Sequence, residues 1–152
     1  MGKQSLEVEF QVAQIASLMA VASESGLGLV ASIDVSTENA RGEVAKKFQR
    51  IISSLELGGN LFDELEKLRS QSKVPALVEL AIKLQVSLQF GTPVSEQLSA
   101  LTRTIRQRIA QQELTESTKR ESLMLLPLVF LILPVTVLFA IFPALKYLNL
   151  NY

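Results

Sequence analysis

Carboxylate side chains are the best candidates for acid–base chemistry in this sequence. The candidates are Asp34, Glu38, Asp63 and Glu64, which a membrane enzyme could use as general acids or bases. Asp63, Glu64 and Glu66 have a simpler interpretation, because acidic residues near the start of a helix interact favourably with its dipole. We therefore interpret these carboxylates as surface charges and predict that the protein is not an enzyme.

The composition excludes the commonest catalytic and metal sites. The chain contains no histidine and no cysteine. Histidine is the usual general base at neutral pH, and zinc sites nearly always use histidine or cysteine ligands. The sequence also lacks a phosphate-binding glycine loop and a G-x-S-x-G motif. We expect no catalytic residue, no metal site and no cofactor.

The charge balance argues against a nucleic-acid partner. Lysine and arginine together number 15, as do aspartate and glutamate, and no block of like charge occurs. Proteins that bind DNA or RNA usually carry a basic excess or a basic patch. The absence of cysteine also suits a reducing compartment.

Residues 123–145 form an apolar segment without a charged side chain, yet they include Pro127, Pro134 and Pro143. A helix of this length is roughly 34 Å long, which matches a hydrocarbon core of about 30 Å. We predict one transmembrane helix here, followed by a short tail at residues 146–152. Proline removes a backbone donor, and the freed groups need other partners inside a membrane. The three prolines are therefore candidate packing positions for neighbouring helices.

Apolar residues recur at steps of three and four along residues 1–109, which indicates amphipathic helices. A further short helix is expected from near Leu29. No alternating strand pattern competes, so the predicted fold class is all-α. The stripes are Val8, Val12, Ile15, Met19 and Ala22; Val44, Phe48, Ile51 and Leu55; Leu61, Leu65 and Leu68; Leu77, Ala81, Leu84 and Leu88; and Val94, Leu98, Leu101, Ile105 and Ile109.

Gly26, Gly58 and Gly91 recur at nearly equal spacing and share one local pattern. Each is followed by two connecting residues, an apolar residue, three more residues and another apolar residue. A glycine at positive φ can end one helix, and an apolar pair four apart can pack the next helix against it. The pattern predicts three helical hairpins in a six-helix bundle. The alternative is that these glycines are simply helix stops. Tetratricopeptide or ankyrin repeats are disfavoured because their consensus residues are absent.

Polar and proline residues predict where three of these helices begin. Asn60 can cap a helix that starts at Leu61, and Pro75 can occupy a first turn. Thr92 and Pro93 are expected to supply a capping hydroxyl and another first-turn proline.

Residues 110–122 are polar on nearly all sides and contain no glycine or proline. We predict that they continue the last bundle helix as a solvated neck. Lys119 and Arg120 precede the apolar segment, whereas only Lys146 follows it. Basic residues favour the cytoplasmic side of a membrane, so the bundle is predicted to be cytoplasmic and the tail external.

The order of these features resembles the type II secretion system F domain family, and within it the tight-adherence (Flp) pilus platform proteins. In that family a cytoplasmic six-helix bundle is followed by a polar run and a terminal span rich in leucine and proline. The resemblance covers roughly residues 10–145. The positions that carry it are Gly91, Pro93, Leu98, Arg103, Lys119, Pro127, Pro134 and Pro143.

This resemblance implies a platform subunit of the bacterial inner membrane, embedded in the lipid bilayer. Such a subunit couples a cytoplasmic hexameric secretion ATPase to the assembly of pilin or pseudopilin. Family members normally carry further spans before the bundle. This chain is therefore expected to be a truncated piece of a longer platform protein, a half-module, or a short relative that pairs with a second platform subunit or forms a homo-oligomer.

A second class of function also fits the residues. A helical bundle followed by a C-terminal span and a short tail is typical of tail-anchored adaptors and regulators. Sustained heptads or an apolar groove would favour that alternative.

Overall fold

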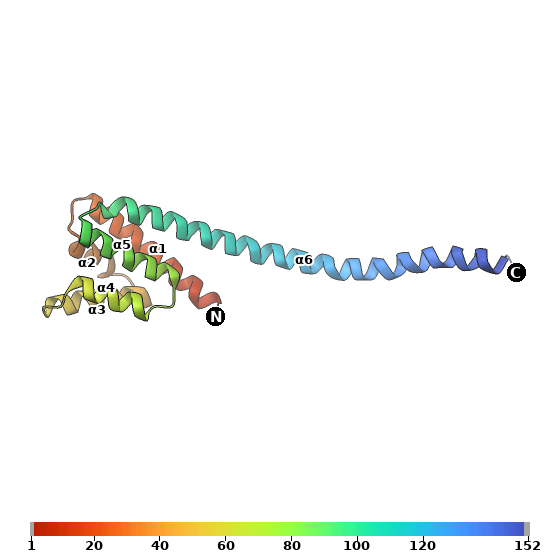
Figure 1. The fold of residues 1–152 in the computed structure, drawn as a ribbon, viewed down its shortest axis with the longest axis horizontal. Coiled ribbons are helices and arrows are strands. Elements are labelled where there is room, and N and C mark those ends of the chain that lie inside the picture. The colour runs from red at the N-terminus through yellow and green to blue at the C-terminus, as the bar shows by residue number, and fades with distance from the viewer. Residues whose placement is uncertain (1, 151–152) are drawn as a thin grey trace. The chain divides into compact units, whose positions relative to one another are not determined.

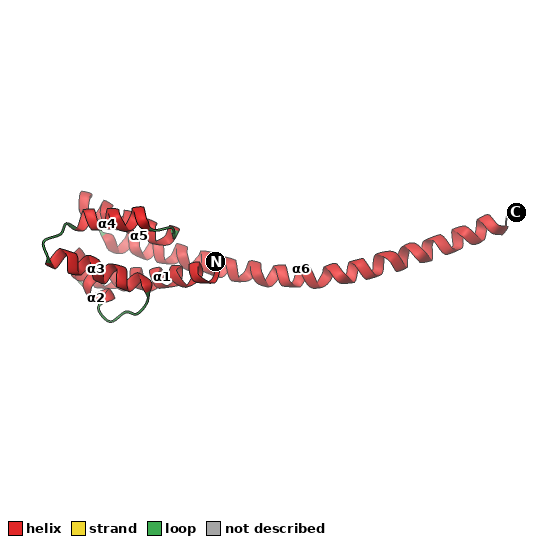
Figure 2. Cartoon of the chain, turned by 90° about the horizontal axis from the view of Figure 1, so that it is seen from below, coloured by secondary structure: helices red, strands yellow, loops and turns green. Residues whose placement is uncertain are grey.

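All the secondary structure in the described part of the chain is helical (Figure 2). The structure, a computed structural model, describes the backbone of residues 2–150 and the side chains of residues 2–114 and 127–149. The chain divides into two compact units, Met1–Ala110 and Gln111–Tyr152. The all-α fold class predicted from the sequence is confirmed.

The first unit is a bundle of five complete helices and the beginning of a sixth (Figure 1). The last helix has residues in both units, and the apolar segment belongs to its second part. The elements are α1 (Gly2–Glu24), α2 (Leu29–Thr37), α3 (Glu43–Glu56), α4 (Leu61–Gln71), α5 (Pro75–Phe90) and α6 (Val94–Leu150).

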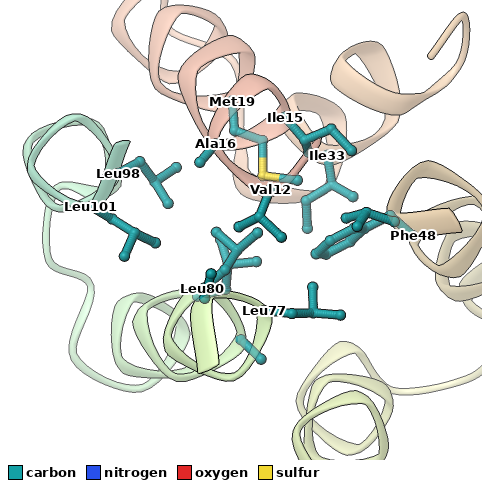
Figure 3. Close-up of a cluster of buried hydrophobic side chains, with 14 of the residues drawn as sticks. Val12, Ile15, Ala16, Met19, Ile33, Phe48, Leu77, Leu80, Leu98 and Leu101 are labelled. Atoms are coloured by element: carbon teal, nitrogen blue, oxygen red, sulfur yellow. The ribbon is translucent and has the colours of Figure 1, made fainter. Parts of the chain in front are cut away.

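The core of the bundle is built around α1. Val12, Ala16 and Met19 are fully buried along one side of this helix. Burying a large apolar side chain stabilises a fold by about 1.5–3 kcal/mol. Figure 3 shows side chains from four other helices meeting this side of α1, namely Ile33 of α2, Phe48 of α3, Leu77 and Leu80 of α5, and Leu98 and Leu101 of α6.

The predicted apolar stripes are largely buried, with one clear error at Leu88. This side chain is 40% exposed, whereas the neighbouring Ser87 is buried. The Ser87 hydroxyl donates a hydrogen bond of 2.9 Å to the carbonyl of Thr92 in the turn before α6. The inward position is therefore taken by a polar residue that gives the carbonyl of Thr92 a donor, and Leu88 faces outward.

One carboxylate is buried among these apolar residues. Glu9 of α1 is buried, and its Oε2 atom has no hydrogen-bond partner within the described residues. An unsatisfied buried polar group costs about 1–3 kcal/mol. The stability of the bundle therefore comes from its apolar contacts and is reduced by this group.

The helix starts follow two of the three sequence predictions. The Asn60 side chain accepts a hydrogen bond of 2.9 Å from the backbone amide of Phe62, which confirms the predicted cap. Pro75 is the first residue of α5, as predicted. However, α6 begins at Val94, after Pro93, so the predicted first-turn proline precedes the helix. The Thr92 hydroxyl accepts a hydrogen bond from the Gln97 side chain, 3.2 Å away, rather than capping the backbone.

A contact between α1 and the start of α3 fixes how these helices meet. Gln11 Oε1 accepts a hydrogen bond of 3.2 Å from the backbone amide of Val44. This bond satisfies one of the free amides at the first turn of α3. Gly42 lies beside it with φ of 125°, and a Cβ atom there would lie 2.5 Å from Gln11 Oε1. Only glycine fits this position without a shift of the Gln11 side chain.

We predict that Gly42→Ala lowers the free energy of unfolding by about 1–3 kcal/mol, since it adds backbone strain and a clash. Gly28→Ala is the matched control, because its added methyl group meets nothing within 4 Å and its φ is −64°. The free energy of unfolding of this control should fall by less than about 1 kcal/mol. Chemical unfolding of the full chain in detergent, followed by circular dichroism, measures both. Equal losses in the two variants would contradict the role assigned to this contact.

Candidate functional site

The second unit contains the feature that most clearly points to function. Within the described residues, Pro127–Asn149 is one helical segment of 23 residues that is long and apolar enough to cross a membrane. The predicted span began at residue 123, but side chains 123–126 lie outside the described residues. Phe130, Phe139 and Phe142 are 75%, 75% and 69% exposed. Exposed apolar area is unfavourable in water at about 25 cal/mol per Å², so this surface needs lipid or protein around it.

The three predicted packing prolines all lie inside α6. At about 3.6 residues per turn, Pro127 and Pro134 lie on nearly the same side of the helix and Pro143 lies on the opposite side. Each proline removes the donor for the carbonyl four residues earlier. For Pro134 this is the carbonyl of Phe130. Pro127 and Pro134 therefore leave carbonyls without a helical donor on one side of the segment, and Pro143 does so on the other side.

The remaining polar groups near this segment are few. The hydroxyl of Thr136 donates a hydrogen bond of 2.8 Å to the carbonyl of Ile132, so it is satisfied within the helix. Lys146 borders a surface hollow of about 480 Å³ together with apolar residues that include Phe142 and Pro143. The predicted basic pair, Lys119 and Arg120, lies outside the residues whose side chains are described.

The three predicted turn glycines follow α1, α3 and α5. Gly26, Gly58 and Gly91 have φ values of 94°, 94° and 65°. At Gly91 the backbone is left-handed, and its amide donates a hydrogen bond of 2.9 Å to the carbonyl of Ser87. These conformations end one helix and allow the next to begin.

The carboxylates considered for catalysis are not assembled into a site. Asp34, Glu38 and Asp63 are exposed, and the described residues contain no cluster of acidic groups able to hold a metal ion. Glu64 forms an ion pair of 2.9 Å with Lys67. The hydrogen bond from Lys67 lowers the pKa of Glu64 below its ordinary value. These positions are consistent with surface charge.

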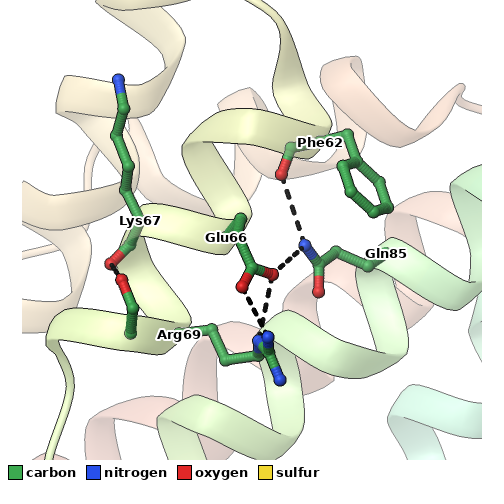
Figure 4. A network of polar contacts seen from close by, with 6 residues as sticks. Phe62, Glu66, Lys67, Arg69 and Gln85 are labelled. Atoms are coloured by element: carbon green, nitrogen blue, oxygen red, sulfur yellow. Dashed lines mark hydrogen bonds and ion pairs between the residues drawn. The ribbon is translucent and has the colours of Figure 1, made fainter.

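Glu66 belongs to a polar network that joins α4 and α5 (Figure 4). Arg69 Nε donates to Glu66 Oε2 at 3.0 Å, and Gln85 Nε2 donates to the same oxygen at 3.0 Å. Gln85 Nε2 also donates to the Phe62 carbonyl at 3.3 Å. The hydrogen bonds from Arg69, chiefly, and from Gln85 lower the pKa of Glu66. The acidic residues in the first turn of α4 are Asp63 and Glu64, so the sequence interpretation of Glu66 as a first-turn charge was wrong. Its half-exposed carboxylate links α4 to α5.

One exposed surface was not predicted from the sequence. We call it the α1 outer face and define it as Phe10, Gln14, Leu18 and Val21. These four residues are exposed, although three of them are large and apolar. They recur at steps of four, four and three, so they lie on one side of the helix. The sequence feature that could have predicted this surface is the presence of Phe10, Leu18 and Val21 outside the predicted buried stripe.

A comparison with protein-family models matches residues 15–142 to the type II secretion system (T2SS), protein F. The chain belongs to this family. Members of the family are membrane platform proteins of type II secretion and type IV pilus machines and are not enzymes. Searches of curated proteins and of solved structures gave no significant match. The matched residues include most of the bundle and most of the apolar segment.

We predict that Glu66→Gln causes a small loss of stability at pH 7 that disappears in acid. Because the pKa of Glu66 is lowered in the folded chain, its carboxylate contributes stability above its ordinary pKa of 4.5. That contribution is lost as the pH falls through the lower folded value. Thermal unfolding of both chains between about pH 2 and pH 7 measures the difference. A difference independent of pH would contradict this assignment.

Proposed function

We propose that this chain is an inner-membrane platform subunit of a type II secretion or tight-adherence pilus assembly machine. It couples a cytoplasmic hexameric secretion ATPase to the assembly of pilin or pseudopilin, and it hydrolyses nothing itself. The observation that carries the proposal is the family match over residues 15–142, which includes parts of both the bundle and the apolar segment.

The orientation in this proposal rests on charge. Lys119 and Arg120 precede the apolar segment, and Lys146 is the single charged residue after it. Basic residues near a span favour the cytoplasmic side. The bundle is therefore cytoplasmic, where a secretion ATPase is accessible to it, and the tail faces outward.

The mechanism in this proposal uses α6, which has residues in both units. A displacement of the bundle by the ATPase is passed along the helical backbone to the apolar segment. The apolar segment presents large side chains and proline-freed carbonyls to the spans around it. Partner helices, from a second platform subunit or another copy of this chain, pack there and satisfy those carbonyls.

We predict that Pro134→Leu reduces platform assembly and pilus or secretion output. Leucine restores the missing backbone donor, so the Phe130 carbonyl is no longer available to a partner and the helix straightens. Leu133→Ile is the matched control, because it changes shape at the same depth without changing the backbone. Blue-native electrophoresis measures assembly, and surface pili or secreted protein measure output. Unchanged values in Pro134→Leu would contradict the role of this proline.

Cross-linking in the native membrane tests the proposed function as a whole. The tagged full chain is cross-linked in its own host, purified, and analysed by mass spectrometry. We expect to recover a hexameric secretion ATPase or a pilin-like subunit at levels above those of an unrelated tagged membrane protein. Repeated recovery of soluble proteins without any assembly machinery would contradict the proposal and favour a tail-anchored adaptor.

A further inference from the structure

The α1 outer face exposes apolar side chains that the bundle does not use. Phe10, Leu18 and Val21 are 53%, 52% and 62% exposed, whereas Val12, Ala16 and Met19 on the other side of the same helix are fully buried. Neighbouring exposed apolar side chains mark an interaction surface more often than isolated ones do. The helix thus has one side that stabilises the bundle and another side that is available for binding.

Two arginines from other parts of the bundle flank this face. Arg41 lies in the connection between α2 and α3, and Arg106 lies on α6. Both line a surface cavity of about 440 Å³. The rest of the lining is amide, hydroxyl and apolar side chains, and it contains no carboxylate: Gln11, Gln14, Ile15, Ser17, Leu18 and Ala40.

Neither of these arginines forms an ion pair within the described residues. Arg69 and Arg108 form ion pairs with Glu66 and Glu79, but no described carboxylate lies within 4.0 Å of Arg41 or Arg106. Arg106 also borders a second cavity of about 390 Å³ with Arg103, and that lining again lacks a carboxylate. The chain as a whole has a formal net charge of zero. The charged side chains that line these two cavities are therefore all positive.

We propose that the α1 outer face, together with Arg41 and Arg106, binds an amphipathic acidic helix of a partner protein. An amphipathic helix docks its apolar face on exposed apolar side chains, with anchors one turn apart. Carboxylates beside those anchors pair with the guanidinium groups, whose planar geometry suits them. A nucleic acid or polyphosphate would engage the arginines but leave Phe10, Leu18 and Val21 in water. This inference does not depend on the platform function.

A designed peptide tests the proposal directly. The probe is a fluorescent helical peptide with leucines at heptad spacing, flanked by glutamates, and the matched peptide has glutamine at each glutamate position. Fluorescence anisotropy with the full chain in neutral detergent measures the affinity of each. The acidic peptide should bind about tenfold or more tightly than its neutral match. Its affinity should fall as sodium chloride rises from about 0.05 M to about 0.5 M.

Substitutions identify the surface. Arg41→Glu combined with Arg106→Glu should weaken the acidic peptide about tenfold or more, and Leu18→Gln should weaken both peptides. Arg50→Glu is the matched control, because Arg50 is also exposed but lines a different cavity, and it should leave the affinity unchanged. A peptide with lysine in place of glutamate should bind the double arginine variant better than it binds the original chain. Thermal unfolding confirms that each variant is folded.

Two results would overturn the proposal. The first is equal affinity of the acidic peptide for the original chain and the folded double arginine variant. The second is tight binding of single-stranded DNA that is lost in the arginine variant but unaffected by Leu18→Gln. That second result would identify a general polyanion site in place of a helix-docking surface.

Discussion

Burial of one side of α1 is the interaction on which the bundle depends. Val12, Ala16 and Met19 are fully buried, and side chains from α2, α3, α5 and α6 meet them (Figure 3). The remaining helix, α4, packs against α5 and α3 and extends the same core. The small alanines of α1 let backbones approach closely, which strengthens dispersion contacts. The Gln11 side chain then fixes the start of α3 at the edge of this core.

The two units are suited to different solvents. The bundle has a buried apolar core and carries most of its charges on the surface, as expected for a fold in water, although Glu9 is buried and the α1 outer face is exposed. The apolar segment does the reverse, since its large side chains are exposed and it lacks charge before Lys146. A single helix in a bilayer satisfies its backbone internally, except where Pro127, Pro134 and Pro143 remove donors. The carbonyls freed at those positions need hydrogen-bond donors from outside the helix.

Local patterns in the sequence predicted most of the fold because helix periodicity, capping residues and glycine stops act over a few residues. Asn60 and Pro75 are examples. Leu88 was misassigned because the burial of Ser87 depends on the carbonyl of Thr92 across a turn, which periodicity does not reveal. The link from Glu66 to Gln85 was not predicted because the two residues lie on different helices. The pairing of Arg41 and Arg106 around α1 is equally non-local, since three separate segments must fold before that surface exists.

The central claim is that the apolar segment crosses the inner membrane with the bundle on the cytoplasmic side. The chain contains no cysteine, so any introduced cysteine is its only reactive thiol. Asn149→Cys, at the C-terminal end of the segment, and Ser53→Cys, on the exposed surface of α3, can each be treated with a membrane-impermeant maleimide in intact cells. We predict that Asn149→Cys is labelled in intact cells and that Ser53→Cys is labelled only after lysis. Labelling of Ser53→Cys in intact cells, with Asn149→Cys protected until lysis, would contradict it.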